Sequence, residues 1–214
     1  MDATELLEKI EPLLTEQRKA RIDAVLNYRL SNIHLALEAP SDINNALATI
    51  RTAEALGIDT VHIIKAEGHA RTAHGMTIGA VYWVNVHYHA SLNAFLNWLR
   101  VQTKIFKLAG AKMDGEYALN NVPLTDPLCI LLGNEHRGLS EEAIKACDFT
   151  FHIPMCGMSE SLNLSVCAAI SLYDITQRLR IHADNDLTAS ELLERKTKFY
   201  TQSVPARVLK NLLK

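Results

Sequence analysis

The chain has 214 residues, of which 48% are hydrophobic and 21% are charged, and its formal net charge is −2. This length and composition fit one α/β domain with extra terminal elements and exclude a largely disordered chain. No apolar run approaches the roughly 20 residues of a membrane helix, and the acidic N-terminus is unlike a signal peptide. Because the four cysteines form no CxxC pair, the sequence predicts free thiols and a cytoplasmic protein.

The two ends of the chain are predicted to be helical, and basic charge is concentrated there. Apolar residues recur at helical spacing in 3–13 and 16–29, which predicts two short amphipathic helices. Segment 191–214 carries six basic and two acidic side chains, whereas 31–190 carries 11 basic and 16 acidic ones. A solvated helix face is the simplest explanation for such charges, and the net charge alone does not indicate a nucleic-acid partner.

Strand and helix patterns alternate from residue 33 onward. The apolar run 33–37 predicts a strand, 45–56 a helix that ends at Gly57, and 60–64 a second strand. Residues 66–80 contain three glycines and two histidines, a composition typical of a loop. This order begins an alternation that continues to the C-terminus.

The later elements complete the predicted fold. Ser91 is a helix cap, and Thr188 with Glu191 forms a capping box for a final helix. Near-continuous apolar strands between helices predict an α/β fold with a mostly parallel sheet and helices on both faces. The absence of a GxGxxG fingerprint and of a P-loop argues against ordinary dinucleotide-binding and nucleotide-hydrolysing domains. The elements predicted after residue 80 are strands at 81–86, 105–108, 128–132 and 149–153, helices at 91–103, 140–146 and 164–180, and a loop at 109–127.

Two of the predicted strands end in residues that suit a ligand site. The strand 128–132 runs into Gly133, and the strand 149–153 continues into a turn at Gly157 and a Ser-Leu-Asn sequence at 161–163. The carboxyl ends of neighbouring strands form the ligand crevice of an open α/β sheet. The sequence therefore predicts a binding site at these two strand ends.

A third candidate segment lies on the helix 45–56. Asn45 and Arg51 are six residues apart, so on an ideal helix their side chains differ by about 120° in direction. If Asn45 caps the helix, its side chain is free to reach the same crevice. Taken alone, a plain helix cap for Asn45 and a surface salt bridge for Arg51 are the simpler explanations.

Three motifs that follow one another along the chain change this interpretation of Asn45 and Arg51. The first pairs Asn45 with Arg51 and closes at Gly57, and the second and third are the segments 132–138 and 153–165. Together they resemble the SpoU/TrmH family of knotted RNA 2′-O-methyltransferases over more than a hundred residues. The chain length and the terminal helical extensions are most similar to the branch of the family that methylates a tRNA guanosine.

The resemblance implies an enzyme with a defined substrate and partner. It implies methyl transfer from S-adenosylmethionine to a ribose 2′-hydroxyl of tRNA, at the D-loop guanosine (position 18). It also implies a C-terminal trefoil knot and a homodimer whose interface completes the active site. Methylation of ribosomal RNA or of a tRNA wobble nucleoside is the alternative within the family, and a non-enzymatic RNA-binding module is the alternative outside it. The expected domains are 1–30, 31–183 and 184–214, the first and last being helical extensions.

Matching the family motifs assigns roles to individual residues. An arginine stays protonated in water, so Arg51 either takes the ribose proton beside an RNA phosphate or only holds that phosphate and stabilises the alkoxide. The expected catalytic residues are Arg51, Asn45, Glu135, Ser161 and Asn163. The expected cofactor-binding residues are Ala109, Gly110, Leu132, Gly133, Ile153, Met155 and Leu162. The expected RNA-binding residues are Arg18, Lys19, Arg21, Arg29, Arg195, Lys196, Lys198, Arg207 and Lys210.

The nine histidines raise the question of a metal site. His87 and His89 alternate along a predicted strand, and His69 and His74 lie in the predicted loop. Neither pair is accompanied by carboxylates or cysteines at the spacing of a zinc site. The sequence therefore predicts no functional metal.

Overall fold

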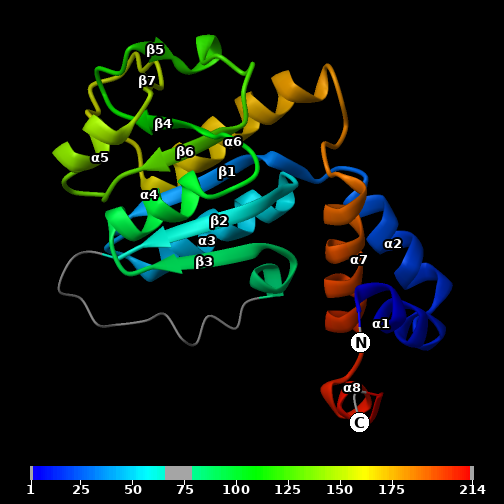
Figure 1. Cartoon of the computed structure of the whole chain (residues 1–214). Coiled ribbons are helices and arrows are strands. Elements are labelled where there is room, and N and C mark those ends of the chain that lie inside the picture. The colour runs from blue at the N-terminus through cyan, green and yellow to red at the C-terminus, as the bar shows by residue number, and fades with distance from the viewer. Residues whose placement is uncertain (1, 66–78, 213–214) are drawn as a thin grey trace. The chain divides into compact units, whose positions relative to one another are not determined.

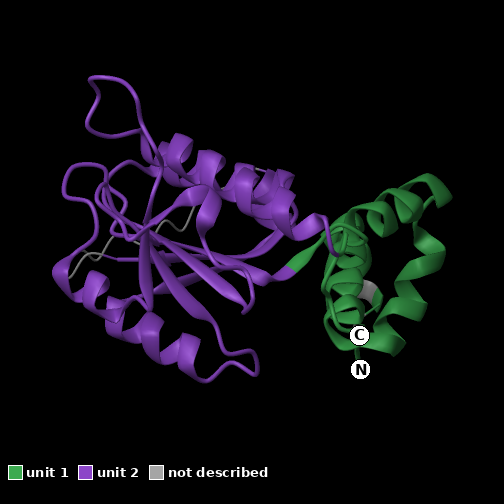
Figure 2. Cartoon of the chain, turned by 90° about the horizontal axis from the view of Figure 1, so that it is seen from above, with its two compact units in different colours: residues 1–30, 183–214 green, residues 31–182 purple. Residues whose placement is uncertain are grey.

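The computed structural model describes residues 2–65 and 79–212 (Figure 1). The chain divides into two compact units, one formed by 31–182 and the other by 1–30 together with 183–214 (Figure 2). The two terminal extensions, expected as separate segments, thus pack into one unit. No helix in the described ranges is long and apolar enough to span a membrane.

The larger unit is built on a seven-stranded sheet in the order β3-β2-β1-β6-β4-β7-β5. The pairs β1–β6, β2–β3, β4–β6, β4–β7 and β5–β7 are all parallel. The central strands β1, β2 and β6 are almost wholly buried, as expected for parallel strands covered on both faces. The strands are β1 (Leu30–Glu38), β2 (Ile58–Ile64), β3 (Asn85–His89), β4 (Lys107–Ala111), β5 (Tyr117–Ala118), β6 (Leu128–Leu132) and β7 (Phe149–His152).

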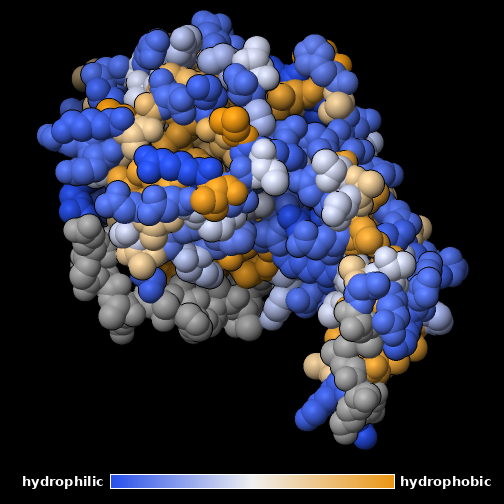
Figure 3. Space-filling model, viewed as in Figure 1, coloured by the Kyte–Doolittle hydropathy of each residue, from blue (hydrophilic) through white to orange (hydrophobic). Residues whose placement is uncertain are grey.

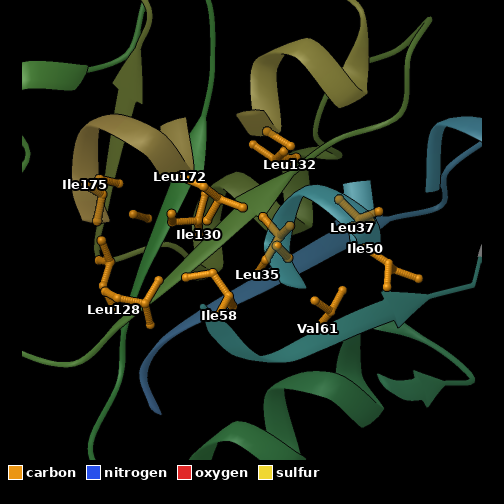
Figure 4. Packing of buried hydrophobic residues seen from close by; sticks show 14 of the residues in the cluster. Leu35, Leu37, Ile50, Ile58, Val61, Leu128, Ile130, Leu132, Leu172 and Ile175 are labelled. Atoms are coloured by element: carbon orange, nitrogen blue, oxygen red, sulfur yellow. The ribbon is translucent and has the colours of Figure 1, made fainter. Parts of the chain in front are cut away.

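Helices cover both faces of this sheet, which confirms the predicted α/β fold. On one face α3 (Ile43–Ala55) and α6 (Leu164–Arg180) pack against side chains of β1, β2 and β6 (Figure 4). On the other face, α4 (Leu92–Arg100) contributes Phe95 and α5 (Glu141–Ala146) contributes Ala143 to a second cluster. Hydrophilic side chains cover most of the molecular face that carries α4 and α5 (Figure 3).

The smaller unit is helical. Helix α7 (Ala189–Ser203) contacts both α1 (Ala3–Ile10) and α2 (Glu16–Leu26), and α8 (Ala206–Leu212) follows it. The predicted capping box of α7 is present. Because α7 supplies the buried Phe199 and Tyr200, it is part of this unit's core and not a detachable basic tail.

Several local predictions were wrong. The apolar run at 81–86 forms a 3₁₀ turn (Gly79–Trp83), and the strand starts only at Asn85, where pairing with β2 begins. The strand predicted at 105–108 lies at Lys107–Ala111, and β5 and α8 were not predicted. The cap of α3 is Asp42, so Asn45 lies inside the first turn. Most of the predicted loop 66–80 lies outside the described residues.

Candidate functional site

The carboxyl ends of β6, β4 and β7 surround a cavity of about 510 Å³. Two of the segments singled out in the sequence, the loop after Leu132 and the chain from Ile153 to Leu164, form its walls together with residues after β4. This is the position at which open α/β sheets bind ligands. The sequence-based prediction of the site's location agrees with this geometry.

The loop after β6 is a tight turn that needs two glycines. Asn134 and Gly138 exchange both backbone hydrogen bonds, with N···O distances of 3.0 and 2.8 Å. Gly138 has a φ of +67°, which a side chain strongly disfavours. A Cβ on Gly133 would stand 2.1 Å from the carbonyl carbon of Gly138, so glycine is required for the loop to close.

Glu135 in this loop binds the start of α3. Its Oε2 accepts hydrogen bonds from the backbone nitrogen of Ser41 (2.8 Å) and from the Ser41 hydroxyl (2.6 Å). Its Oε1 accepts from Asn45 Nδ2 at 3.0 Å. These contacts indicate that Glu135, expected as a catalytic residue, holds the loop in place against the start of α3.

Asn45 links Glu135 to the third motif. Asn163 Nδ2 donates to Asn45 Oδ1 at 3.1 Å, while Asn163 Oδ1 accepts from the backbone and hydroxyl of Ser165 at the start of α6. Each amide therefore has its orientation fixed by a partner on another segment. Three of the five expected catalytic residues, Glu135, Asn45 and Asn163, form one hydrogen-bonded chain, and Ser161 lies in the cavity wall.

The carboxylate of Glu135 is stabilised by these donors. Burial by itself would raise its pKa, but the hydrogen bonds from Ser41 and Asn45 outweigh burial and lower the pKa of Glu135 to about 2. A carboxylate whose pKa is lower in the folded state than in the unfolded state stabilises the fold. This contribution is complete at pH values above the pKa of the unfolded state and is lost as the pH falls toward the pKa of the folded state.

Replacing Glu135 with glutamine is expected to remove this pH dependence. At pH 7 the variant should be less stable than the wild type by about 1–2 kcal/mol, because the charged acceptor is lost. The difference should shrink by up to about 1 kcal/mol between pH 6 and pH 4, where the wild type begins to lose its contribution. Urea unfolding of both proteins at each pH measures this. A difference that stays constant over this range would contradict the assignment.

The cavity suits an adenosine-containing cofactor. Its volume lies within the roughly 300–1,000 Å³ of small-molecule sites, and its lining combines apolar side chains such as Leu132 and Leu162 with polar ones. Charged side chains of both signs line it: Asp114 and Glu160 are acidic, Lys112 and Arg137 are basic, and Lys112 pairs with Asp114 at 3.0 Å. Five of the predicted cofactor-binding residues line the cavity: Leu132, Gly133, Ile153, Met155 and Leu162.

The other two predicted cofactor-binding residues need correction. Ala109 and Gly110 do not line the cavity, because β4 runs on to Ala111 and they lie within the strand. Ala109 is fully buried, and a Cβ on Gly110 would meet Cys147 Sγ at 2.7 Å. The segment 111–114 lines the cavity in their place. Recognising that the apolar run continues to Ala111 would have located this wall from the sequence.

Arg51 lies in a different depression. It is exposed on α3 and lines a groove of about 1020 Å³ between α3 and α6, together with Leu56, Ile170 and Tyr173. Ile153 is shared with the wall of the cavity, but Arg51 is not among the cavity's lining residues. The single chain therefore does not bring Arg51 into the cavity that holds Ser161.

The predicted RNA-binding residues divide by exposure. Arg29 is fully buried with its guanidinium carbon 5.5 Å from the Phe199 ring centroid, so in this conformation it cannot contact a phosphate, which corrects the prediction. Lys196 pairs with Asp23 at 2.8 Å. Partly buried are Arg18, Lys19, Arg195, Lys196 and Lys198, whereas Arg21, Arg207 and Lys210 are exposed.

Four histidines gather under α4. His62 is buried between His34 and His89, with ring nitrogens 3.1 and 3.0 Å from theirs, and His87 stacks on it. Within the described ranges, no three histidine, cysteine, aspartate or glutamate side chains are placed to hold a metal ion. His69 and His74 lie outside the described residues.

Comparison with known proteins identifies relatives over most of the chain. Residues 32–173 match the profile of the family described as SpoU rRNA Methylase. A tRNA (guanosine(18)-2′-O)-methyltransferase of Borreliella burgdorferi is 30% identical over 205 residues, covering 95% of this chain and 93% of the relative. The enzyme of the same name from Escherichia coli K12 is 34% identical over 176 residues, covering 82% and 76%.

Solved structures with the same architecture are also similar. The A. aeolicus TrmH/SpoU tRNA modifying enzyme superposes with a TM-score of 0.74 at 25% identity, covering 89% of this chain and 98% of that one. The SpoU methyltransferase AviRb from Streptomyces viridochromogenes, in complex with AdoMet, gives a TM-score of 0.64 at 26% identity, covering 75% and 62%.

Proposed function

Because the chain belongs to the SpoU methylase family, we propose that it transfers the methyl group of S-adenosylmethionine to the ribose 2′-hydroxyl of guanosine 18 in tRNA. The observation that carries the proposal is the hydrogen-bonded chain Glu135–Asn45–Asn163 beside a cavity of cofactor size. Relatives aligned over nearly the whole chain bear this activity in their names. We also propose a cytoplasmic location, which the four free cysteines and a tRNA substrate would fit.

The chain's residues position the reactants for this reaction. The cofactor supplies a methyl group on a cationic sulfur, so the transfer requires no metal and no covalent enzyme intermediate. The ribose hydroxyl is a weak acid and must be oriented toward the methyl group. Ser161 lines the cavity, Asn163 follows it two residues later and is fixed by Asn45, and both side chains would orient the ribose. Arg51 stabilises the developing alkoxide or holds the adjacent phosphate.

A second copy of the chain is the proposed occupant of the groove between α3 and α6. The groove is lined largely by apolar side chains, and Val166, Ile170 and Tyr173 on α6 are 43%, 38% and 59% exposed. Large exposed apolar patches mark interfaces. Pairing of two copies over this groove brings Arg51 of one chain toward the second chain and completes a site that one chain leaves without it.

Methyl transfer from labelled S-adenosylmethionine to an unmodified tRNA transcript, with the modified nucleotide mapped, tests the function. Methylation of the guanosine 18 ribose is the expected result. Methylation of only ribosomal RNA or only a wobble nucleoside would support the proposed reaction but contradict guanosine 18 of tRNA as its substrate. Failure to bind S-adenosylmethionine would favour the non-enzymatic RNA-binding module.

Exposed basic residues of the helical unit are proposed to contact tRNA phosphates. Replacing Arg21, Arg207 and Lys210 together with glutamate is expected to weaken tRNA binding by about tenfold or more and to flatten its salt dependence. Filter binding at several salt concentrations measures both effects. Arg100→Glu, Lys107→Glu and Lys145→Glu provide a control with the same charge change at exposed positions of the larger unit that do not line the cavity. Equal weakening in both variants would contradict a localised tRNA surface.

A further inference from the structure

Two loops at the carboxyl end of the sheet hold each other through side chains. The first, 38–42, follows β1, and the second, 133–140, follows β6. Glu135 of the second loop accepts hydrogen bonds from Ser41 of the first. In the opposite direction, Glu38 of the first loop accepts hydrogen bonds from Ser140 of the second, at 2.9 Å from its backbone nitrogen and 2.6 Å from its hydroxyl. Each loop thus supplies both a carboxylate and a serine.

Glu38 has an unusual environment for a carboxylate. Its side chain belongs to a residue that is only 9% exposed, and among the described residues no lysine or arginine pairs with it. A buried carboxylate is costly unless hydrogen-bonded donors compensate for the lost water. Ser140 provides one donor to each carboxylate oxygen. The requirement to satisfy Glu38 therefore fixes the position of Ser140, and with it the end of the loop.

Asn134 adds a third connection. Its Nδ2 donates to the carbonyl oxygen of Ala39 at 2.7 Å, and its Oδ1 accepts from the backbone nitrogen of His136 at 2.9 Å. Ala39 has a φ of +49°, a left-handed conformation disfavoured by its Cβ. The backbone of Ala39 is held there by Asn134 on one side and by a 2.8 Å hydrogen bond to Ile64 on the other. The second loop thus helps fix the path by which the chain enters α3.

We propose that Glu38 and Ser140 are positioning residues for methyl transfer. They fix the loop 133–140, and this loop carries both Glu135, which orients Asn45, and the backbone that lines the cofactor cavity. Neither residue lines the cavity, and neither belongs to the expected catalytic or cofactor-binding set. The inference rests on the methyl transfer proposed above.

Replacing Ser140 with alanine tests the proposal. The variant loses the hydroxyl donor to Glu38, and it also loses the cap of α5, because the same oxygen accepts from Ala143 at 3.1 Å. Ser91→Ala is the matched control. Ser91 caps α4 by accepting a 3.2 Å hydrogen bond from the backbone nitrogen of Ala94, and Ser91 lies outside the site. We expect Ser140→Ala to raise KM for S-adenosylmethionine about tenfold and to lower kcat about tenfold, with wild-type values for Ser91→Ala.

Two further variants distinguish positioning from stability. Ser140→Thr keeps both hydroxyl and cap and should restore KM and kcat, whereas Glu38→Leu should reproduce the defect of Ser140→Ala. If Ser140→Ala unfolds, Glu38→Gln, which keeps an acceptor oxygen, should still raise KM. Partial unfolding alone lowers apparent kcat and leaves KM unchanged, so an unchanged KM in an active, folded Ser140→Ala protein would overturn the positioning role. An inactive wild type would instead refute the proposed function, and the positioning role with it.

Discussion

Replacing Arg51 with alanine is expected to lower kcat for tRNA methylation by about 10²–10⁴-fold while leaving the affinity for S-adenosylmethionine unchanged. The side chain is exposed on α3 and does not line the cofactor cavity, so its removal leaves the cofactor walls intact. Single-turnover rates with tRNA and calorimetric titration with the cofactor measure the two quantities separately. Wild-type turnover in the variant would remove Arg51 from the mechanism.

For a charged Arg51, the lysine variant separates stabilisation of the alkoxide from bidentate contact with the phosphate. Lysine keeps a positive charge but lacks the planar fork with which arginine binds phosphate oxygens in pairs. If Arg51 acts through charge alone, Arg51→Lys should retain activity within about tenfold of the wild type. If bidentate contact with a phosphate is essential, the lysine variant should resemble the alanine variant.

Mixed dimers test whether Arg51 serves the partner's cavity. One parent is Arg51→Ala, and the other is Leu162→Trp, whose indole fills the cavity that Leu162 lines. In a mixed dimer the cavity of the first parent is intact and meets the Arg51 of the second. Random pairing of two inactive parents should therefore recover about a quarter of wild-type activity. No recovery would show that Arg51 acts within its own chain.

The fold could largely be predicted from the sequence, because parallel strands that are buried on both faces consist of consecutive apolar residues. The runs at 33–37, 60–64 and 128–132 all became strands. The run at 81–86 misled because periodicity cannot separate a short buried strand from a 3₁₀ turn whose residues pack on the same core. The knot and the homodimer remain predictions from the family resemblance. The spacing of residues along the sequence shows neither whether the chain passes through a loop nor whether it binds a second copy.

Local motifs located the site but not its internal contacts. Glycines at 133 and 138 and the amides at 45 and 163 marked the loops correctly. The bond between Glu38 and Ser140 joins positions 102 residues apart, and nothing local in the sequence marks such a pair. Arg29 was misjudged because a basic residue on an amphipathic helix looks exposed until the packing of a distant helix, here α7, is known.

Acid is expected to destabilise the fold through the histidines under α4. Burial, and then the neighbouring histidines, lower the pKa of His62, while burial and then His87 lower the pKa of His89 to about 4. An unfolded histidine titrates near 6.5, so below this pH the unfolded state binds more protons than the folded state. Stability is therefore full above pH 6.5 and falls with acidification. Acidification from pH 7.5 to pH 5 should lower the free energy of unfolding by up to about 2 kcal/mol for each of these two histidines.

Replacing His62 with phenylalanine isolates this effect. The ring keeps much of the packing against Phe95 and Trp98 but cannot bind a proton, and it breaks the hydrogen bonds to His34 and His89. The variant should be less stable at pH 7.5 by about 1–3 kcal/mol, because two buried ring nitrogens lose their partner. Its loss of stability between pH 7.5 and pH 5 should nevertheless be smaller than that of the wild type by up to about 2 kcal/mol.

Urea unfolding at pH 7.5, 6 and 5 measures both differences. Equal acid sensitivity in the wild type and His62→Phe would mean that the burial of His62 carries no proton linkage. Because acidification should narrow the stability difference, whereas a general loss of packing would leave it constant, a packing defect cannot imitate the predicted result. The wild type and the variant should approach each other in stability as the pH falls, because burial keeps His62 neutral in the folded state while the unfolded state binds a proton.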